Sequence, residues 1–260
     1  MQKILMTLAL GAAFSCAILA PSLAADEANE IRPVDAKVTK IALDGIVALK
    51  VRQGATPSLV VYGDKAYIGK ITTTQNGDTL RIGTDIHEMR EFRAVGPHRT
   101  EMRAELTLPA LNELVSSGIG SSDVSGFGGD ALRVSLSGAG KMQVISLHKL
   151  VRASLSGVGQ LTIDAGDAET VELALPGAGS VVATGKTKKL SASLSGVGNL
   201  DAREMSAARA TVTLSGLGNA SVNVSQEINV IMSGLGSATV YGQPVQRHST
   251  NSGMGRVEFK

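Results

Sequence analysis

The chain has 260 residues, a formal net charge of +2 and 43% hydrophobic residues, which is enough apolar material for one substantial core. This charge balance does not point to nucleic acid or to an anionic surface. The single cysteine excludes a disulfide framework, and the absence of tryptophan with only 3% aromatic residues argues against long aromatic platforms for sugars.

Residues 1–25 have the pattern of a secretory signal peptide. An apolar run from Ile4 to Ala20 follows a charged start, and Ser22-Leu23-Ala24 is a small-x-small cleavage site. Cys16 lies inside this leader, so the mature chain is expected to contain no cysteine. A transmembrane anchor is the alternative interpretation, but the apolar run is short. We therefore expect a periplasmic or extracellular bacterial protein with no integral membrane segment after cleavage.

The next residues, 26–33, are expected to be a flexible leader to a single β domain spanning 34–260. Within 34–107 the pattern is strand-like and irregular, with turn signals between the runs. The expected strands are Val38–Leu43, Gly45–Val51, Leu59–Tyr62, Lys70–Thr74 and Thr79–Ile82. They are interpreted as irregular N-terminal coils of a solenoid, and a separate small β domain is the alternative.

Residues 84–105 interrupt the strand pattern with a cluster of charges of both signs. One interpretation is a solvated loop or short helix whose charges pair internally. The other is a partner-binding loop held by a rigid base, since loops of this kind often carry function. In that case Arg90, Arg93, His98 and Arg99 are the candidate binding residues, for an anionic glycan or a protein surface rich in carboxylates.

A Gly-x-Gly signal recurs eight times between residues 108 and 260, at intervals of 18 to 20 residues. A repeat this regular predicts one supersecondary unit stacked on itself. The first glycines of the pairs are Gly118, Gly138, Gly157, Gly177, Gly196, Gly216, Gly234 and Gly253.

The residues around each glycine pair alternate with a period of two, which is typical of β-strands. A coil of 19 to 20 residues has a perimeter of about 60 Å, too short for a propeller blade or a helix. The repeats therefore predict an all-β fold, a parallel β-solenoid with regular coils over 108–260. We interpret the glycines as corners that need positive φ or close backbone approach, with the apolar residue between them pointing into the core.

Stacking also predicts ladders of identical residues. A serine precedes the first glycine in seven of the eight copies and is expected to form a hydroxyl ladder or to stabilise the turn. Asn199 and Asn219, each three residues after a first glycine, are expected to form a two-step amide ladder.

No metal, cofactor or catalytic residue is expected. No glycine pair has the Gly-x-Gly-x-x-Gly or Gly-Lys-Ser/Thr pattern of a phosphate-binding loop. The histidines His87, His98, His148 and His248 lack the spacing of metal ligands. Counted forward from the glycines, the acidic residues fall at scattered offsets, so no pair of carboxylates is expected side by side.

Several segments together resemble a known family. They are Ala48–Gly54, Val60–Asp64, Gly77–Ile82, the Leu-Ser-Gly-x-Gly series, and the ending Ala238–Pro244. The chain is similar over residues 34–258 to the bacterial family named putative auto-transporter adhesin, head GIN domain. The resemblance implies a right-handed, single-stranded parallel β-helix in secreted or envelope proteins, and it brings no catalytic residues.

These observations favour a non-enzymatic exported β-helix for adhesion or binding, with an envelope glycan or a surface protein as partner and no role in nucleic-acid binding. A carbohydrate-active β-helix enzyme is one alternative. A structural module that self-associates through the open end of its solenoid is the other.

Overall fold

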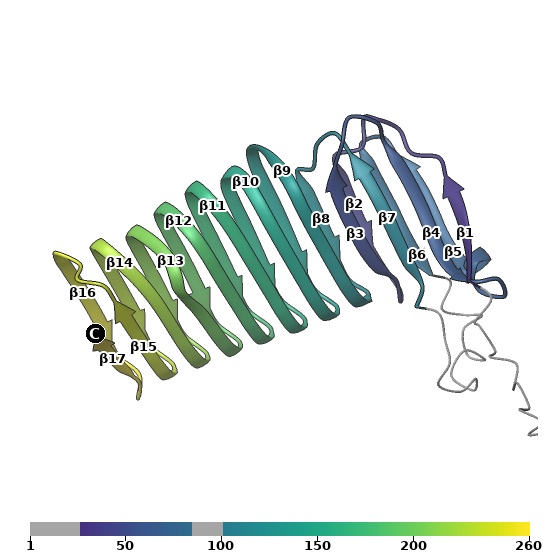
Figure 1. Ribbon diagram of the computed structural model, residues 1–260. Coiled ribbons are helices and arrows are strands. Elements are labelled where there is room, and N and C mark those ends of the chain that lie inside the picture. The colour runs from purple at the N-terminus through teal and green to yellow at the C-terminus, as the bar shows by residue number, and fades with distance from the viewer. Residues whose placement is uncertain (1–26, 85–100) are drawn as a thin grey trace, which may run out of the picture.

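The computed structural model describes residues 27–84 and 101–260, which form one continuous β-sheet wound into a solenoid (Figure 1). Its first elements are β1 (Glu27–Arg32), β2 (Lys40–Leu43), β3 (Ala48–Gln53), β4 (Ser58–Asp64), the 3-10 turn η1 (Ile68–Lys70), β5 (Ile71–Asn76), β6 (Thr79–Thr84), β7 (Arg103–Leu108) and β8 (Glu113–Ser116). The repeats supply β9 (Ile119–Leu136), β10 (Ala139–Leu155), β11 (Val158–Leu175), β12 (Ala178–Leu194), β13 (Val197–Leu214), β14 (Leu217–Met232), β15 (Leu235–Tyr241), β16 (Gln246–Asn251) and β17 (Arg256–Phe259). The predicted parallel β-solenoid is confirmed, with about seven turns of about 20 residues each.

Each regular coil has two sides. In β11 the outgoing side comprises residues 158–164 and the return side 170–175, separated by a bend where the ladder register shifts. A Gly-x-Gly corner then joins the return side to the next coil, and these corners line the lower edge of the solenoid in Figure 1. Because the corners stay in register while the bends do not, the bends accommodate the variation in coil length.

The interior is filled by apolar side chains that face each other from the two sides. In β11 the buried residues include Leu161 and Ile163 on the outgoing side and Val171, Leu173 and Leu175 on the return side. Full burial of such a side chain contributes about 1.5–3 kcal/mol. Each regular coil therefore adds a similar increment to one core that runs from Val38 to Val240.

The N-terminal strands belong to the same sheet but are not all coils. Strands β2 and β3 run parallel to β8 and β9 and so form an additional turn of the solenoid. By contrast, β4 pairs antiparallel with β7, and β5 pairs antiparallel with β6. The expectation of a flexible leader over 26–33 is wrong for most of that segment, because β1 pairs antiparallel with β4 along its full length.

The last coil is polar where the others are apolar. Arg247, Ser249 and Asn251 of β16 occupy the positions of buried Ile228, Val230 and Met232 in the preceding coil. The Arg247 guanidinium lies 5.1 Å from the centre of the Phe259 ring on the opposite side of the coil. A coil with polar residues at these positions leaves little apolar surface for stacking against its open side.

The corner glycines are required by close packing between coils. None of the eight first glycines has a positive φ, so of the two expected requirements, positive φ and close backbone approach, only the second applies at these positions. A Cβ atom added at Gly157 would overlap the Gly138 carbonyl oxygen and lie 2.6 Å from the Ser137 carbonyl carbon. The neighbouring atoms belong to the backbone of the preceding coil and cannot move aside without breaking the ladder.

The residue between the two glycines faces solvent, contrary to the sequence interpretation. Counted from the first glycine, the buried residues stand two before it and four and six after it, all at even positions. The middle residue stands at an odd position, like the exposed serine before the pair, so the alternation continues unbroken through the corner. We call the exposed row the apolar ridge. It consists of Ile119, Ala139, Val158, Ala178, Val197, Leu217, Leu235 and Met254.

The predicted amide ladder is confirmed and is longer than expected. Asn219 Nδ2 donates to Asn199 Oδ1 at 3.1 Å, and Ser237 Oγ donates to Asn219 Oδ1 at 2.6 Å. The serine column behaves differently, because the hydroxyls of Ser137 and Ser252 bond to the backbone of the preceding coil. Ser137 Oγ donates to Ser116 O at 3.3 Å, and Ser252 Oγ donates to Met232 O at 3.4 Å.

The packing at the corners yields a stability prediction. Gly157→Ala and Gly196→Ala should each lower the free energy of unfolding by about 2–4 kcal/mol, because the new methyl group meets rigid backbone. Urea denaturation of the purified variants measures this loss. Gly69→Ala is the matched control, since a Cβ there has no atom within 4 Å, and its effect should stay within about 0.5 kcal/mol. Equal stability of all three variants would contradict the packing argument.

Candidate functional site

The outward side chains of the return sides stack into straight columns. Arg133, Arg152 and Glu172 occupy equivalent positions on β9, β10 and β11. The neighbouring column, closer to the corner, contains small residues such as Ser135 and Ser154. Long side chains beside a row of small ones leave a hollow between them.

This hollow, which we call the return-side groove, crosses four coils from β9 to β12 and has a volume of about 680 Å³. Arg133, Arg152, Glu172 and Lys189 supply its charged side chains. Its hydroxyl groups come from Ser135, Ser154, Thr170, Ser191 and Ser193. The groove therefore presents hydrogen-bonding groups in rows at the coil spacing of about 4.8 Å.

The groove carries more positive than negative charge. Arg152 Nε forms an ion pair with Glu172 Oε2 at 2.7 Å. Within residues 27–84 and 101–260, the Arg133 guanidinium and the Lys189 ammonium have no carboxylate within salt-bridge distance. Three cations thus line the groove against one carboxylate, and two of the cations are available to a ligand.

A second hollow of about 420 Å³ continues the groove toward the N-terminal strands and shares Arg133 and Arg152 with it. Its other charged residues are Lys40, Glu113 and Asp130. Lys40 is already paired with Asp78, and the resulting hydrogen bond and attraction raise the pKa of Lys40 and lower that of Asp78. The charge of Lys40 is therefore largely neutralised, whereas Glu113, which is in register with Arg133, adds a negative charge to this part.

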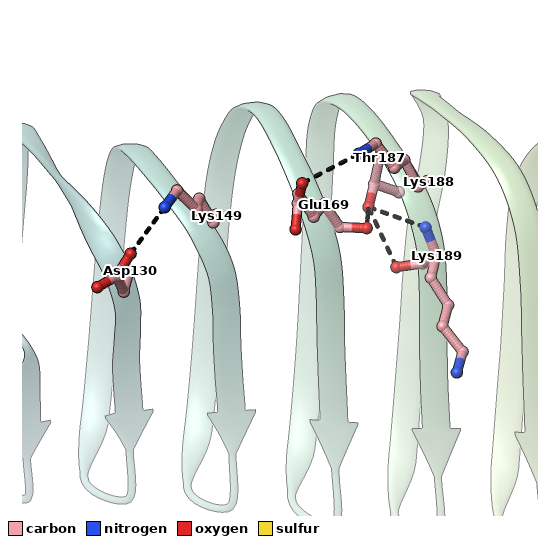
Figure 2. A network of polar contacts seen from close by, with 6 residues as sticks. All are labelled: Asp130, Lys149, Glu169, Thr187, Lys188 and Lys189. Carbon is pink, nitrogen blue, oxygen red and sulfur yellow. Dashed lines mark hydrogen bonds and ion pairs between the residues drawn. The ribbon is translucent and has the colours of Figure 1, made fainter.

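Beside the groove, near the bend, charges of alternating sign form a ladder across four coils (Figure 2). Lys149 Nζ contacts Asp130 Oδ1 at 2.9 Å, and Lys188 Nζ contacts Glu169 Oε1 at 3.0 Å. The hydrogen bond from each lysine lowers the pKa of its carboxyl partner. All four side chains are exposed, so each pair contributes little to stability, and the ladder is neutral as a whole.

Acid–base catalysis by a pair of carboxylates finds no support in this groove. Glu172 is the only carboxylate that lines it, and Glu172 is bound to Arg152. Lys149 stands between Asp130 and Glu169 in the ladder (Figure 2). Among the described residues, no three His, Cys, Asp or Glu side chains gather closely enough to hold a metal ion.

His148 is a structural residue inside the solenoid. Its side chain is buried, with Nε2 3.1 Å from Leu111 O and Nδ1 2.9 Å from Ser146 Oγ. A neutral imidazole satisfies both contacts if Nε2–H donates to the carbonyl and Nδ1 accepts from the hydroxyl. Burial disfavours the charged form and lowers the pKa of His148.

The four residues predicted to bind a partner, Arg90, Arg93, His98 and Arg99, lie outside the described residues. The groove residues were not singled out from the sequence because offsets were counted forward from each glycine pair. Counted backward from the next pair, Arg133, Arg152 and Glu172 each stand five residues before a first glycine. Asp130, Lys149, Glu169 and Lys188 each stand eight before one. Counting positions back from the following glycine pair therefore identifies both the groove column and the charged ladder in the sequence.

A parallel β-solenoid presents long, regular side surfaces, and in this chain one of them carries the return-side groove. The chain is a member of the family described as putative auto-transporter adhesin, head GIN domain, which matches residues 37–244 and confirms the resemblance seen in the sequence. A comparison with curated proteins finds no match.

Solved structures share the fold. A putative adhesin from Parabacteroides merdae ATCC 43184 has a TM-score of 0.75 and 17% identity, over 90% of this chain and 96% of that one. A putative adhesin from Bacteroides fragilis NCTC 9343 has a TM-score of 0.66 and 18% identity, over 90% and 97%. A putative lipid binding protein from Parabacteroides distasonis ATCC 8503 has a TM-score of 0.72 and 18% identity, over 89% and 96%.

The described part of the chain contains no helix with the length and apolar character needed to span a membrane.

The environment of His148 yields a prediction for stability against pH. The folded pKa is depressed, so the unfolded chain binds the proton more tightly, and stability should fall as the pH drops below the unfolded pKa of about 6.5. The loss should level off once the pH lies below the folded pKa. Thermal melts between about pH 7.5 and pH 5 measure it.

His148→Gln is the comparison, because glutamine does not titrate. Its melting temperature should be lower at neutral pH and should change less over the same interval. A wild-type curve and a variant curve with the same slope would show that His148 does not carry this dependence.

Proposed function

We propose that this chain is an exported, non-enzymatic binding protein whose return-side groove holds an acidic polysaccharide of the cell envelope or cell surface. The family and the solved neighbours named as adhesins support a role in adhesion or binding. The observation that carries the proposal is a pair of cations, Arg133 and Lys189, which lie beside rows of hydroxyl groups in the groove and have no carboxylate partner among the described residues.

The shape of the groove supports an extended ligand. A polymer lying along the solenoid axis meets hydroxyl groups on all four coils and a cation on β9, β10 and β12, so successive units of the ligand each find a polar partner. Arg133 and Lys189 bind carboxylate or sulfate groups by charge-assisted hydrogen bonds, and Arg152 joins them when its pairing with Glu172 loosens. The serine and threonine hydroxyls both donate to and accept from sugar hydroxyls.

The first test is neutralisation of the free cations. The double variant Arg133→Gln/Lys189→Gln should bind polygalacturonate at least about tenfold more weakly than wild type, because two charge-assisted bonds are lost. Titration calorimetry measures the affinity, with dextran as the neutral polymer. Lys37→Gln/Lys186→Gln is the matched control, because it removes the same charge from exposed positions outside the groove.

Equal affinity of the two double variants would contradict the groove as the binding site. Wild-type binding should also weaken as salt is added, since it depends on charge. The length of the polymer is followed in the same samples by size-exclusion chromatography. Shortened polygalacturonate would contradict the non-enzymatic assignment and favour the carbohydrate-active alternative.

A second test removes the groove's carboxylate. Glu172→Gln releases Arg152 from its ion pair and takes away a negative charge that repels the ligand. Affinity for polygalacturonate should rise about two- to tenfold. Glu227→Gln, which removes a carboxylate outside the groove, serves as the comparison. A fall in affinity on Glu172→Gln would show that this residue contacts the ligand itself.

A further inference from the structure

The apolar ridge is an exposed hydrophobic feature that the proposed function does not use. The side chains of Val158 and Val197 are 63% and 58% exposed, and that of Met254 is 86% exposed. Isolated apolar residues on a surface need no explanation, but a contiguous row of them marks a contact surface. This row occupies every corner from β9 to the end of the chain.

The columns that flank the ridge are polar and carry no negative charge over these coils. On one side stands the column of serines, with Pro176 as its exception, and on the other the column that contains Ser180, Asn199 and Asn219. The only charged residues in the two columns are Lys141 and Arg256. The first carboxylates lie one column further out on the outgoing side, at Asp123, Asp201 and Glu258.

At its N-terminal end the ridge is continued by Ile46, because Gly45 takes the place of the first glycine beside Gly118. Here Asp44 occupies the serine column. Its carboxylate is held by Arg81 at 2.6 Å and by the hydroxyl of Ser117. The single acidic residue beside the ridge is therefore already neutralised.

The shape of the ridge selects among possible partners. Eight positions at about 4.8 Å make a straight edge about 34 Å long but only one residue wide. A second copy meeting it edge to edge would bury far less than the ~800 Å² per partner of a stable interface. A flat bilayer, in contrast, touches a straight edge along its whole length.

We propose that this edge docks on a membrane surface that contains anionic phospholipids, with the solenoid axis parallel to the bilayer. The apolar side chains enter the boundary between headgroups and acyl chains, and the serine and asparagine columns face the headgroups. Lys141 faces the lipid phosphates, and Arg256, which pairs with Glu258 at 3.2 Å, reaches them when this exposed pair opens. Apolar insertion combined with basic charge is the chemistry by which proteins bind the interface without spanning it.

The docking is independent of polysaccharide binding, because the return-side groove lies on the side of the solenoid and not on its edge. Polygalacturonate titration tests the groove, and vesicle binding tests the ridge. Either proposal can therefore fail without the other.

A single tryptophan reports on the docking directly, since the chain has none of its own. Val197→Trp places the indole on the ridge. Leu147→Trp, at a 66% exposed residue near the opposite bend, is the control. On addition of phosphatidylcholine–phosphatidylglycerol vesicles, the Val197→Trp emission should shift to the blue and be quenched by lipids with brominated acyl chains. Leu147→Trp should show neither change. Equal responses, or none at Val197→Trp, would overturn the proposal.

A second experiment removes the apolar side chains. The triple variant Val158→Ser/Val197→Ser/Leu217→Ser should partition onto the same vesicles at least about tenfold less than wild type. Ile145→Ser/Leu147→Ser/Val245→Ser removes three exposed apolar side chains from the bend region and should bind as wild type does. All forms carry the same N-terminal residues, so these contribute equally, and circular dichroism melts confirm that each variant is folded.

Equal vesicle binding by the two triple variants would overturn the proposal. A lower molecular mass in solution for the ridge variant alone would also overturn the proposal, because it would show that the ridge contacts a second copy of the chain. Binding that persists on vesicles of phosphatidylcholine alone would remove the role given to Lys141 and Arg256.

Discussion

The structure depends on one steric constraint, the lack of room for a Cβ atom where two coils pass each other at a corner. At Gly157 and at Gly196 an added methyl group would overlap a carbonyl oxygen of the coil before. With glycine there, the backbones approach closely enough for each corner to hydrogen-bond to the last, as Val158 N does to Gly138 O at 3.0 Å. This contact fixes the register of both sides of the coil.

A fixed register turns scattered residues into columns. The interior columns are apolar and form the continuous core, while the outward columns carry the chemistry. Arg133 and Arg152 become neighbours although 19 residues separate them, and Asp130 meets Lys149 in the same way. The function proposed for the return-side groove therefore depends on a regular backbone in which every coil repeats the geometry of the one before. The groove and the apolar ridge differ in chemistry because they lie on a side and on an edge of the same coils.

Much of the fold was predictable from the spacing of the glycine pairs. A period of 18 to 20 residues with internal alternation leaves a parallel solenoid as the architecture that fits, and the five strand runs expected between Val38 and Ile82 all overlap observed strands. The asparagine ladder followed from the same logic, because equal offsets after a corner stack directly. The antiparallel pairing of β4 with β7 did not follow, since no repeat marks it and strand direction is set by partners distant in sequence.

The sequence by itself thus determined the solenoid, its coil length and the family, because these rest on a repeat that can be counted. Tertiary structure alone decided which way Val158 and Val197 face. In the sequence, an apolar residue between two glycines is compatible with a buried and with an exposed side chain until the geometry of the corner is known. It also decided that Arg133, Arg152 and Glu172 form one column. Coils differ in length by one or two residues, and the bends take up this difference. Residues on the return side therefore align between coils only when their positions are counted back from the corner that follows. The hydrogen-bond register of the folded chain shows that this count is the correct one.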